Sequence, residues 1–186
     1  MEIELILLFI FILILINGFF AASEMAIVSI RKSTLNDLIQ SKHKNALLLK
    51  KVKEDSTGYL STIQVAITLA GFLSSALAGS NLVDDLIKII PMPENVAVVL
   101  ITIVLSYITL VLGELVPKRI ALNNPKKFAL FSIKTIYVTM IITKPAVWLL
   151  SKTTNAILKL LGSSQKSKAK VSENDIRSLV RHGHLQ

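Results

Sequence analysis

Cysteine is absent from the 186-residue chain, and histidine occurs only three times. The lack of cysteine excludes disulfide bonds and thiolate metal sites. The sequence also has no glycine-rich phosphate loop, and its apolar segments hold no pairing of a nucleophile with a base. These absences argue against an enzyme and against a transition-metal site built from histidine, cysteine or methionine.

Charge is missing from three long stretches, which run from Leu5 to Ala22, from Tyr59 to Val83 and from Asn95 to Gly113. A helix needs about 20 apolar residues to cross a hydrocarbon core of about 30 Å. No stretch sustains the alternation of polar and apolar residues that marks a half-buried strand. We therefore predict an all-α membrane protein. Its three transmembrane helices are expected at about residues 5–24, 59–80 and 95–116.

The first stretch could be mistaken for a cleaved signal peptide, because Ala21-Ala22-Ser23 resembles a cleavage site. Signal peptides begin with a basic segment. This chain begins with Met1-Glu2-Ile3-Glu4, which is acidic. We therefore interpret the stretch as a membrane-spanning helix of the mature protein.

Basic residues give the chain a formal charge of +9 and lie beside the apolar stretches. The connections after the first and third stretches are basic, whereas the one between the second and third holds Asp84, Asp85 and Glu94 with only Lys88. Cytoplasmic loops carry an excess of lysine and arginine. We predict a multi-pass protein of the cell membrane with its N-terminus outside and its C-terminus in the cytoplasm. The basic charge then needs no nucleic-acid partner.

Two further segments are predicted to lie at the cytoplasmic surface. Residues 29–56 show broken amphipathic spacing, which indicates a helical hairpin. Residues 126–161 are apolar, but Pro145 interrupts them and they carry four lysines, at positions 134, 144, 152 and 159. This pattern favours a juxtamembrane amphipathic belt helix. The alternative is a fourth span, which would bury Lys134 at a cost of about 2.5–3.5 kcal/mol and send the basic tail outside.

The composition changes after Gly162, where a polar basic linker begins. Ser172 and Asp175 then have the spacing of a capped helix start. We therefore assign residues 1–162 to a transmembrane domain. Residues 163–186 are expected to be a linker and the start of a cytoplasmic region that is truncated here.

Polar residues within the first two stretches are candidate functional groups. Asn17 needs a polar partner in the membrane, and it could bond a neighbouring helix as a purely structural contact. In the second stretch Thr68, Gly71 and Ser75 share one helix face with Gln64. Small residues at this spacing also allow close helix packing. Gln64 is not small, however, and the shared face favours Ser75 over Ser74.

The end of the third stretch offers two oxygen ligands at one place. Pro117 has no N–H group, so the carbonyl of Gly113 loses its helical partner. That carbonyl lies next to the carboxylate of Glu114, and Mg²⁺ prefers such oxygen ligands. Transporter sites commonly use interrupted helices in this way. The alternative is that Glu114 lies near the membrane surface and pairs with Lys118, four residues on.

Three motifs together resemble the transmembrane domain of the CorC/CNNM (cyclin M) magnesium exporters, which were also called hemolysin-related proteins. They are NGFFAASEMA at residues 17–26, STIQV and ITLAGFL at 61–65 and 67–73, and LGELVPKR at 112–119. The resemblance covers roughly residues 5–180 in the same order. It implies a homodimer in the lipid membrane, with three spans and a wrapped juxtamembrane helix in each subunit.

The resemblance also implies Mg²⁺ efflux driven by Na⁺ entry. Its ligand candidates are Ser23, the Gly71 carbonyl with the nearby Thr68 and Ser75, and Glu114, with Asn17 as a weaker one. Family members continue into a paired CBS module that binds ATP, which would lie beyond Gln186. The alternative function is a membrane-anchored dimeric module that senses Mg²⁺ without transporting it. A lytic function is disfavoured, because the spans lack the polar faces of a pore-forming protein.

Overall fold

The computed structural model describes residues 3–161 of the chain. The predicted linker and capped helix at residues 163–186 lie outside this range. All regular structure in the described range is helical, as the sequence predicts. The helices are α1 (Ile3–Ser29), α2 (Lys32–Gln40), α3 (Ala46–Glu54), α4 (Ser56–Asn81), α5 (Val83–Ile89), α6 (Glu94–Leu110), the π-helical turn η1 (Val111–Leu115), α7 (Val116–Asn123) and α8 (Pro125–Leu160).

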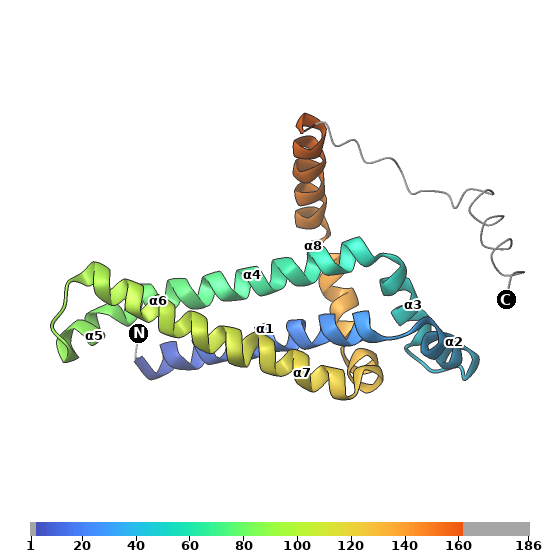
Figure 1. Ribbon diagram of the computed structural model, residues 1–186, viewed down its shortest axis with the longest axis horizontal. Coiled ribbons are helices and arrows are strands. Elements are labelled where there is room, and N and C mark those ends of the chain that lie inside the picture. Colours follow the sequence, from blue (N-terminus) through green and yellow to red (C-terminus); the bar gives the residue numbers. More distant parts are fainter. Residues whose placement is uncertain (1–2, 162–186) are drawn as a thin grey trace, which may run out of the picture. The chain divides into compact units, whose positions relative to one another are not determined.

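Three long helical segments lie side by side: α1, α4 and the continuous run α6–η1–α7 (Figure 1). The hairpin of α2 and α3 lies at one end of this bundle, and α5 lies at the other end (Figure 1). The predicted helical hairpin is therefore present as two short helices. The acidic pair Asp84 and Asp85 belongs to α5, so it is a bundle length away from the basic residues of α2 and α3.

The helices extend further than the uncharged stretches that predicted them. α1 continues through Glu24 to Ser29, and the third run continues through Glu114 to Asn123. Glutamate is a good helix former, so one carboxylate at the end of an apolar run does not end the helix. The predicted boundaries mark the loss of apolar character rather than the end of hydrogen bonding.

Within residues 3–161, four helical stretches are long and apolar enough to cross a membrane: α1, α4, residues 94–123 and α8. The sequence predicted the first three as spans and α8 as a belt. At 36 residues, α8 is about 54 Å long, well beyond the roughly 30 Å of a hydrocarbon core. Length and composition therefore allow α8 to be a membrane span, but they do not decide whether it crosses the membrane or lies along its surface.

The described residues divide into two compact units after Val147, and α8 contributes to both. Within the first unit, the part of α8 up to Val147 runs across the direction of α1 and α4 (orange in Figure 1). Its buried residues Ala129, Ile133 and Ile136 join a core with α1, α2, α3 and the start of α4. In the second unit, the Lys152 ammonium lies 4.2 Å from the ring centroid of Trp148.

Apolar side chains cover the outside of the bundle as well as its core. A small core joins Ile6, Ile10 and Ile14 of α1 to Ala78 of α4. On α6, most apolar side chains point outward instead, and Ile103 is 61% exposed. An apolar exterior of this extent is unfavourable in water but suits contact with lipid chains.

Two glycines bring α1 against the π-helical turn and α7. A Cβ atom at Gly18 would lie 3.0 Å from the Pro117 Cγ atom. A Cβ atom at Gly113 would lie 3.2 Å from the Asn17 Nδ2 atom. Glycine at both positions therefore permits a backbone approach that larger residues would block. This contact places Asn17 directly beside the interrupted helix.

Lys53 ties the hairpin to the end of α1. Its ammonium donates to the carbonyl oxygens of Ile27 at 2.9 Å and Ile30 at 2.6 Å. Carbonyls at a helix C-terminus lack intrahelical donors and carry partial negative charge, so a lysine stabilises them. Burial lowers the pKa of the Lys53 side chain. The end of α1 is thus held by α3 rather than left to solvent.

Candidate ion-binding cavity

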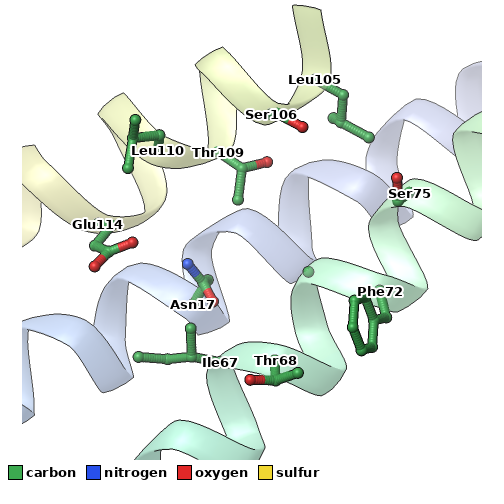
Figure 2. Close-up of a pocket in the computed structure, with 11 residues that line it drawn as sticks. Asn17, Ile67, Thr68, Phe72, Ser75, Leu105, Ser106, Thr109, Leu110 and Glu114 are labelled. Atoms are coloured by element: carbon green, nitrogen blue, oxygen red, sulfur yellow. The ribbon is translucent and has the colours of Figure 1, made fainter. Parts of the chain in front are cut away.

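A cavity of about 470 Å³ lies between α1, α4, α6 and the π-helical turn. Figure 2 shows its lining side chains, with polar groups from all of these elements facing one space. The lining residues are Asn17, Ile67, Thr68, Gly71, Phe72, Ser75, Leu105, Ser106, Thr109, Leu110 and Glu114. Polar groups gathered at one place in an otherwise apolar bundle make this cavity the candidate functional site.

Asn17 lines this cavity and also binds the interrupted helix. Its Nδ2 atom donates to the Gly113 carbonyl oxygen at 3.0 Å. Pro117 cannot supply the usual helical N–H to that carbonyl, and the wide turn instead pairs the Val116 N–H with the Val111 carbonyl. The structural contact considered for Asn17 is therefore present. The Gly113 carbonyl, predicted as a ligand in its own right, is already bonded to the amide.

The other end of the Asn17 amide lacks a partner among the described residues. The side chain is 2% exposed, and its Oδ1 atom accepts no hydrogen bond there. The bond from Nδ2 to Gly113 fixes which end of the amide is the oxygen. A buried acceptor left unpaired costs about 1–3 kcal/mol. A cation or its water shell in the cavity would relieve that cost.

Glu114 lines the cavity and is paired with a lysine at the same time. The Lys118 ammonium lies 2.9 Å from Glu114 Oε1 and 3.4 Å from Glu24 Oε2. All three side chains are partly buried, with 23% to 35% of each exposed. The predicted alternative of a Glu114–Lys118 pair is thus observed together with the cavity position, so the two interpretations are compatible.

The α4 candidates lie on the cavity wall. Thr68, Gly71 and Ser75 all line the cavity, whereas Ser74 is buried with 2% of its surface exposed. Among the described residues, nothing lies within 4 Å of a Cβ atom placed on Gly71. The shared face of α4 therefore borders open space within this chain rather than a close helix contact. Gln64 donates to the Thr68 hydroxyl at 3.3 Å, which explains its place on that face.

Ser23 is the predicted ligand that the structure leaves outside the cavity. It is fully buried, and its hydroxyl donates to the Phe19 carbonyl oxygen at 2.6 Å within α1. Serine commonly makes this bond one turn back along its own helix. Five of the seven predicted residues thus line the cavity, and a sixth, Gly113, accepts a hydrogen bond from the lining residue Asn17.

Sequence reasoning missed the contribution of α6. Ser106 and Thr109 line the cavity above Glu114 (Figure 2). Ser106 and Thr109 are three residues apart, and Thr109 and Gly113 are four apart, which places all three on one helix face. The same rule that found the α4 face would have found this one. Glu24 was also missed as the second acidic partner of Lys118.

The donor set suits a hard cation that keeps part of its water. The cavity offers one carboxylate and the hydroxyls of Thr68, Ser75, Ser106 and Thr109, and the buried Asn17 amide lies beside them. Among residues 3–161, no cluster of three or more His, Cys, Asp or Glu side chains could hold a metal. Mg²⁺ with six waters needs roughly 180 Å³, at about 30 Å³ per water, so it fits the cavity.

Long apolar helices with an open cavity between them that several polar side chains line define a multi-pass membrane protein of transporter-like organisation. Residues 8–186 match the family described as Cyclin M transmembrane N-terminal domain, or CNNM. The chain therefore belongs to the CNNM transmembrane-domain family, which is a membrane module rather than an enzyme family. The family resemblance stated from the sequence motifs is confirmed.

Curated relatives match nearly the whole chain. UPF0053 protein sll0260 of Synechocystis is 36% identical over 98% of this chain and 42% of its own length. The polyamine export protein of Haemophilus influenzae is 24% identical over 98% of this chain and 44% of its own length. UPF0053 inner membrane protein YfjD of Escherichia coli is 24% identical over 92% of this chain and 39% of its own length. The chain spans about two fifths of the length of these relatives.

Proposed function

We propose that this chain forms the ion-binding membrane domain of a magnesium exporter that uses Na⁺ entry as its driving force. The observation that carries the proposal is the cavity, where Glu114 and oxygen-bearing side chains from three helical segments line one space beside the buried, unpaired Asn17 oxygen. Family membership supports a transport role. The absence of soft ligands from the cavity wall supports Mg²⁺ over transition metals.

The Lys118 ammonium competes with the transported cation for the Glu114 carboxylate. While no cation is bound, the single positive charge of Lys118 is shared between Glu114 and Glu24. An arriving Mg²⁺ draws Glu114 away from Lys118, which stays paired with Glu24. The ion pair re-forms when Mg²⁺ leaves, so release does not expose an isolated carboxylate in a low-dielectric site. Because Glu114 exchanges between Lys118 and Mg²⁺, the binding of Mg²⁺ stays reversible.

Export of Mg²⁺ needs an energy source. Moving two positive charges out against an inside-negative potential costs about 4.6 kcal/mol per 100 mV. Entry of Na⁺ down its gradient opposes that cost. The direct test is flux in proteoliposomes that contain only the purified full-length protein. We expect Mg²⁺ movement that depends on an opposing Na⁺ gradient and stops when choline replaces Na⁺.

The same assay separates two alternatives. A regulatory module that senses Mg²⁺ would be stabilised by the ion against heat and yet show no flux. A polyamine exporter would move putrescine in place of Mg²⁺. One relative is named a polyamine export protein, and here the alkylammonium of Lys118 already bridges two carboxylates. Flux of putrescine without flux of Mg²⁺ would reassign the substrate.

For the topology, we propose three spans, an outside N-terminus and a cytoplasmic α8 that lies along the membrane surface. The opposite ends of the bundle support this orientation, because the α2–α3 end is basic and α5 is acidic. The crossing direction of residues 125–147 supports a surface helix (Figure 1). A surface path also spares Lys134 from the hydrocarbon core.

Single-cysteine labelling tests this topology, and the cysteine-free sequence provides a clean background. In intact cells, a membrane-impermeant maleimide should label Asp84→Cys. It should label Ser41→Cys and Lys159→Cys only after permeabilisation. Labelling of Lys159→Cys from outside would mean that α8 crosses the bilayer.

We also propose that the protein forms a homodimer and that a CBS pair regulates it. The homodimer and the ATP-binding CBS pair implied by the family resemblance would complete the transporter. The ATP site would lie beyond Gln186, so the transmembrane domain alone should bind Mg²⁺ without responding to ATP.

A further inference from the structure

A second polar cavity, of about 260 Å³, lies between α3, the start of α4 and the first part of α8. It shares no lining residue with the ion-binding cavity. Its lining residues are Lys51, Asp55, Gly58, Thr62, Tyr137, Met140, Ile141, Lys144 and Val147. All of them belong to the first compact unit. The proposed transport mechanism does not use this second cavity.

The charge of this second cavity is positive. Lys51 and Lys144 both line it, and the Lys51 ammonium donates to the Tyr137 hydroxyl at 2.8 Å. The same ammonium lies 4.9 Å from the Tyr137 ring centroid, which fixes its position. Asp55 is the one acidic lining residue, and its Oδ1 atom accepts from the Gly58 N–H at 3.1 Å at the start of α4. Both lysine ammonium groups retain unused donors, since each has three.

The other side of the second cavity is apolar. Met140, Ile141 and Val147 of α8 line it, and Ile141 is 57% exposed. Thr143 donates to the Thr62 hydroxyl at 3.2 Å, which holds α8 against α4 beside these residues. An anion with a hydrocarbon chain matches two ammonium groups next to an apolar strip. Free phosphate would leave the apolar strip without a partner.

We propose that the second cavity binds the headgroup of an anionic phospholipid, which bridges α3 and α8. The phosphate lies between Lys51 and Lys144 and accepts from the Tyr137 hydroxyl, while an acyl chain follows Ile141 and Met140. A surface position of α8 puts this site at headgroup level, where anionic lipids attract basic segments. The bound lipid fastens α8 to α3, beside the start of α4. The inference depends on the membrane path of α8 and not on the transported ion.

Lipid binding to the delipidated full-length protein tests the proposal. Phosphatidylglycerol should bind and raise the thermal transition, whereas phosphatidylcholine should not. The double variant Lys51→Gln/Lys144→Gln should bind phosphatidylglycerol roughly 10- to 30-fold more weakly. The matched control Lys126→Gln/Lys127→Gln removes the same charge from exposed residues at the start of α8 and should bind as the parent does. Equal losses in both double variants would overturn the site.

Two further measurements leave both lysines in place. Inorganic phosphate should not raise the thermal transition, and stabilisation equal to that by phosphatidylglycerol would overturn the lipid assignment. A fluorophore on Ile141→Cys should be quenched more by spin-labelled phosphatidylglycerol than by spin-labelled phosphatidylcholine. The same fluorophore on Ile103→Cys, on the outer face of α6, should show no preference. Equal quenching at Ile141→Cys by the two lipids would contradict the proposal.

Discussion

Replacing Glu114 by glutamine should weaken Mg²⁺ binding roughly 10- to 150-fold and remove Na⁺-dependent Mg²⁺ flux. A hydrogen bond or ligand contact to a charged group contributes about 1.5–3 kcal/mol, and each 1.4 kcal/mol is a factor of ten. Glu114 is the one carboxylate on the cavity wall. Glutamine keeps its shape, so the loss reports charge rather than packing. Mg²⁺-dependent thermal stabilisation measures binding, and proteoliposome flux measures transport.

Two companion variants make that result specific. Glu54→Gln removes an exposed carboxylate whose nearest lysine lies 3.8 Å away, and it should bind Mg²⁺ and transport it normally. Lys118→Gln removes the competing ammonium, so Mg²⁺ binding should tighten by up to about fivefold while turnover slows. If Glu114→Gln binds and transports Mg²⁺ as the parent does, the cavity is not the ion site.

Replacing Asn17 by alanine should damage both stability and ion binding. The change leaves the Gly113 carbonyl buried without its donor, at a cost of about 1–3 kcal/mol. The thermal transition should fall by roughly 2–12 °C for a chain of this size. The change also removes the buried, unpaired oxygen beside the proposed ion site. Mg²⁺ should therefore restore less stability to Asn17→Ala than it adds to the parent.

Asn81→Ala is the matched control for this variant. Asn81 also donates through its amide to a backbone carbonyl, that of Leu77, but within one helix and away from the cavity. Its loss should lower the thermal transition slightly and leave the Mg²⁺ response intact. An unchanged Mg²⁺ response in Asn17→Ala would limit Asn17 to a structural role.

Several features of the site follow from local rules and were predictable. The missing N–H of Pro117 predicts an interrupted helix near Gly113, and the structure contains a π-helical turn there. The four-three-four spacing on α4 places Thr68, Gly71 and Ser75 on one cavity wall. The three uncharged stretches each became a long helix, because apolar length is a property of the sequence alone.

Other features depend on partners that sequence spacing does not reveal. Asn17 lies 96 positions from Gly113, and no local rule pairs them. Ser23 was a ligand candidate because the family resemblance implies it, but in this chain its hydroxyl donates to the Phe19 carbonyl oxygen within α1. Ser106 and Thr109 escaped notice because they interrupt an apolar run without breaking it. Which polar group faces a cavity is decided by helix rotation, and tertiary contacts set that rotation.

The π-helical turn also changes the rotation of the helix that follows it. An α-helix advances about 100° per residue, so a turn widened by one residue changes the direction of every side chain after it by that amount. Tightening Val111–Leu115 to the α-helical repeat would swing the start of α7 around its axis while α6 stayed still. Lys118 and Glu24 would then separate without any helix having to tilt. A single wide turn can thus let α7 rotate relative to α6.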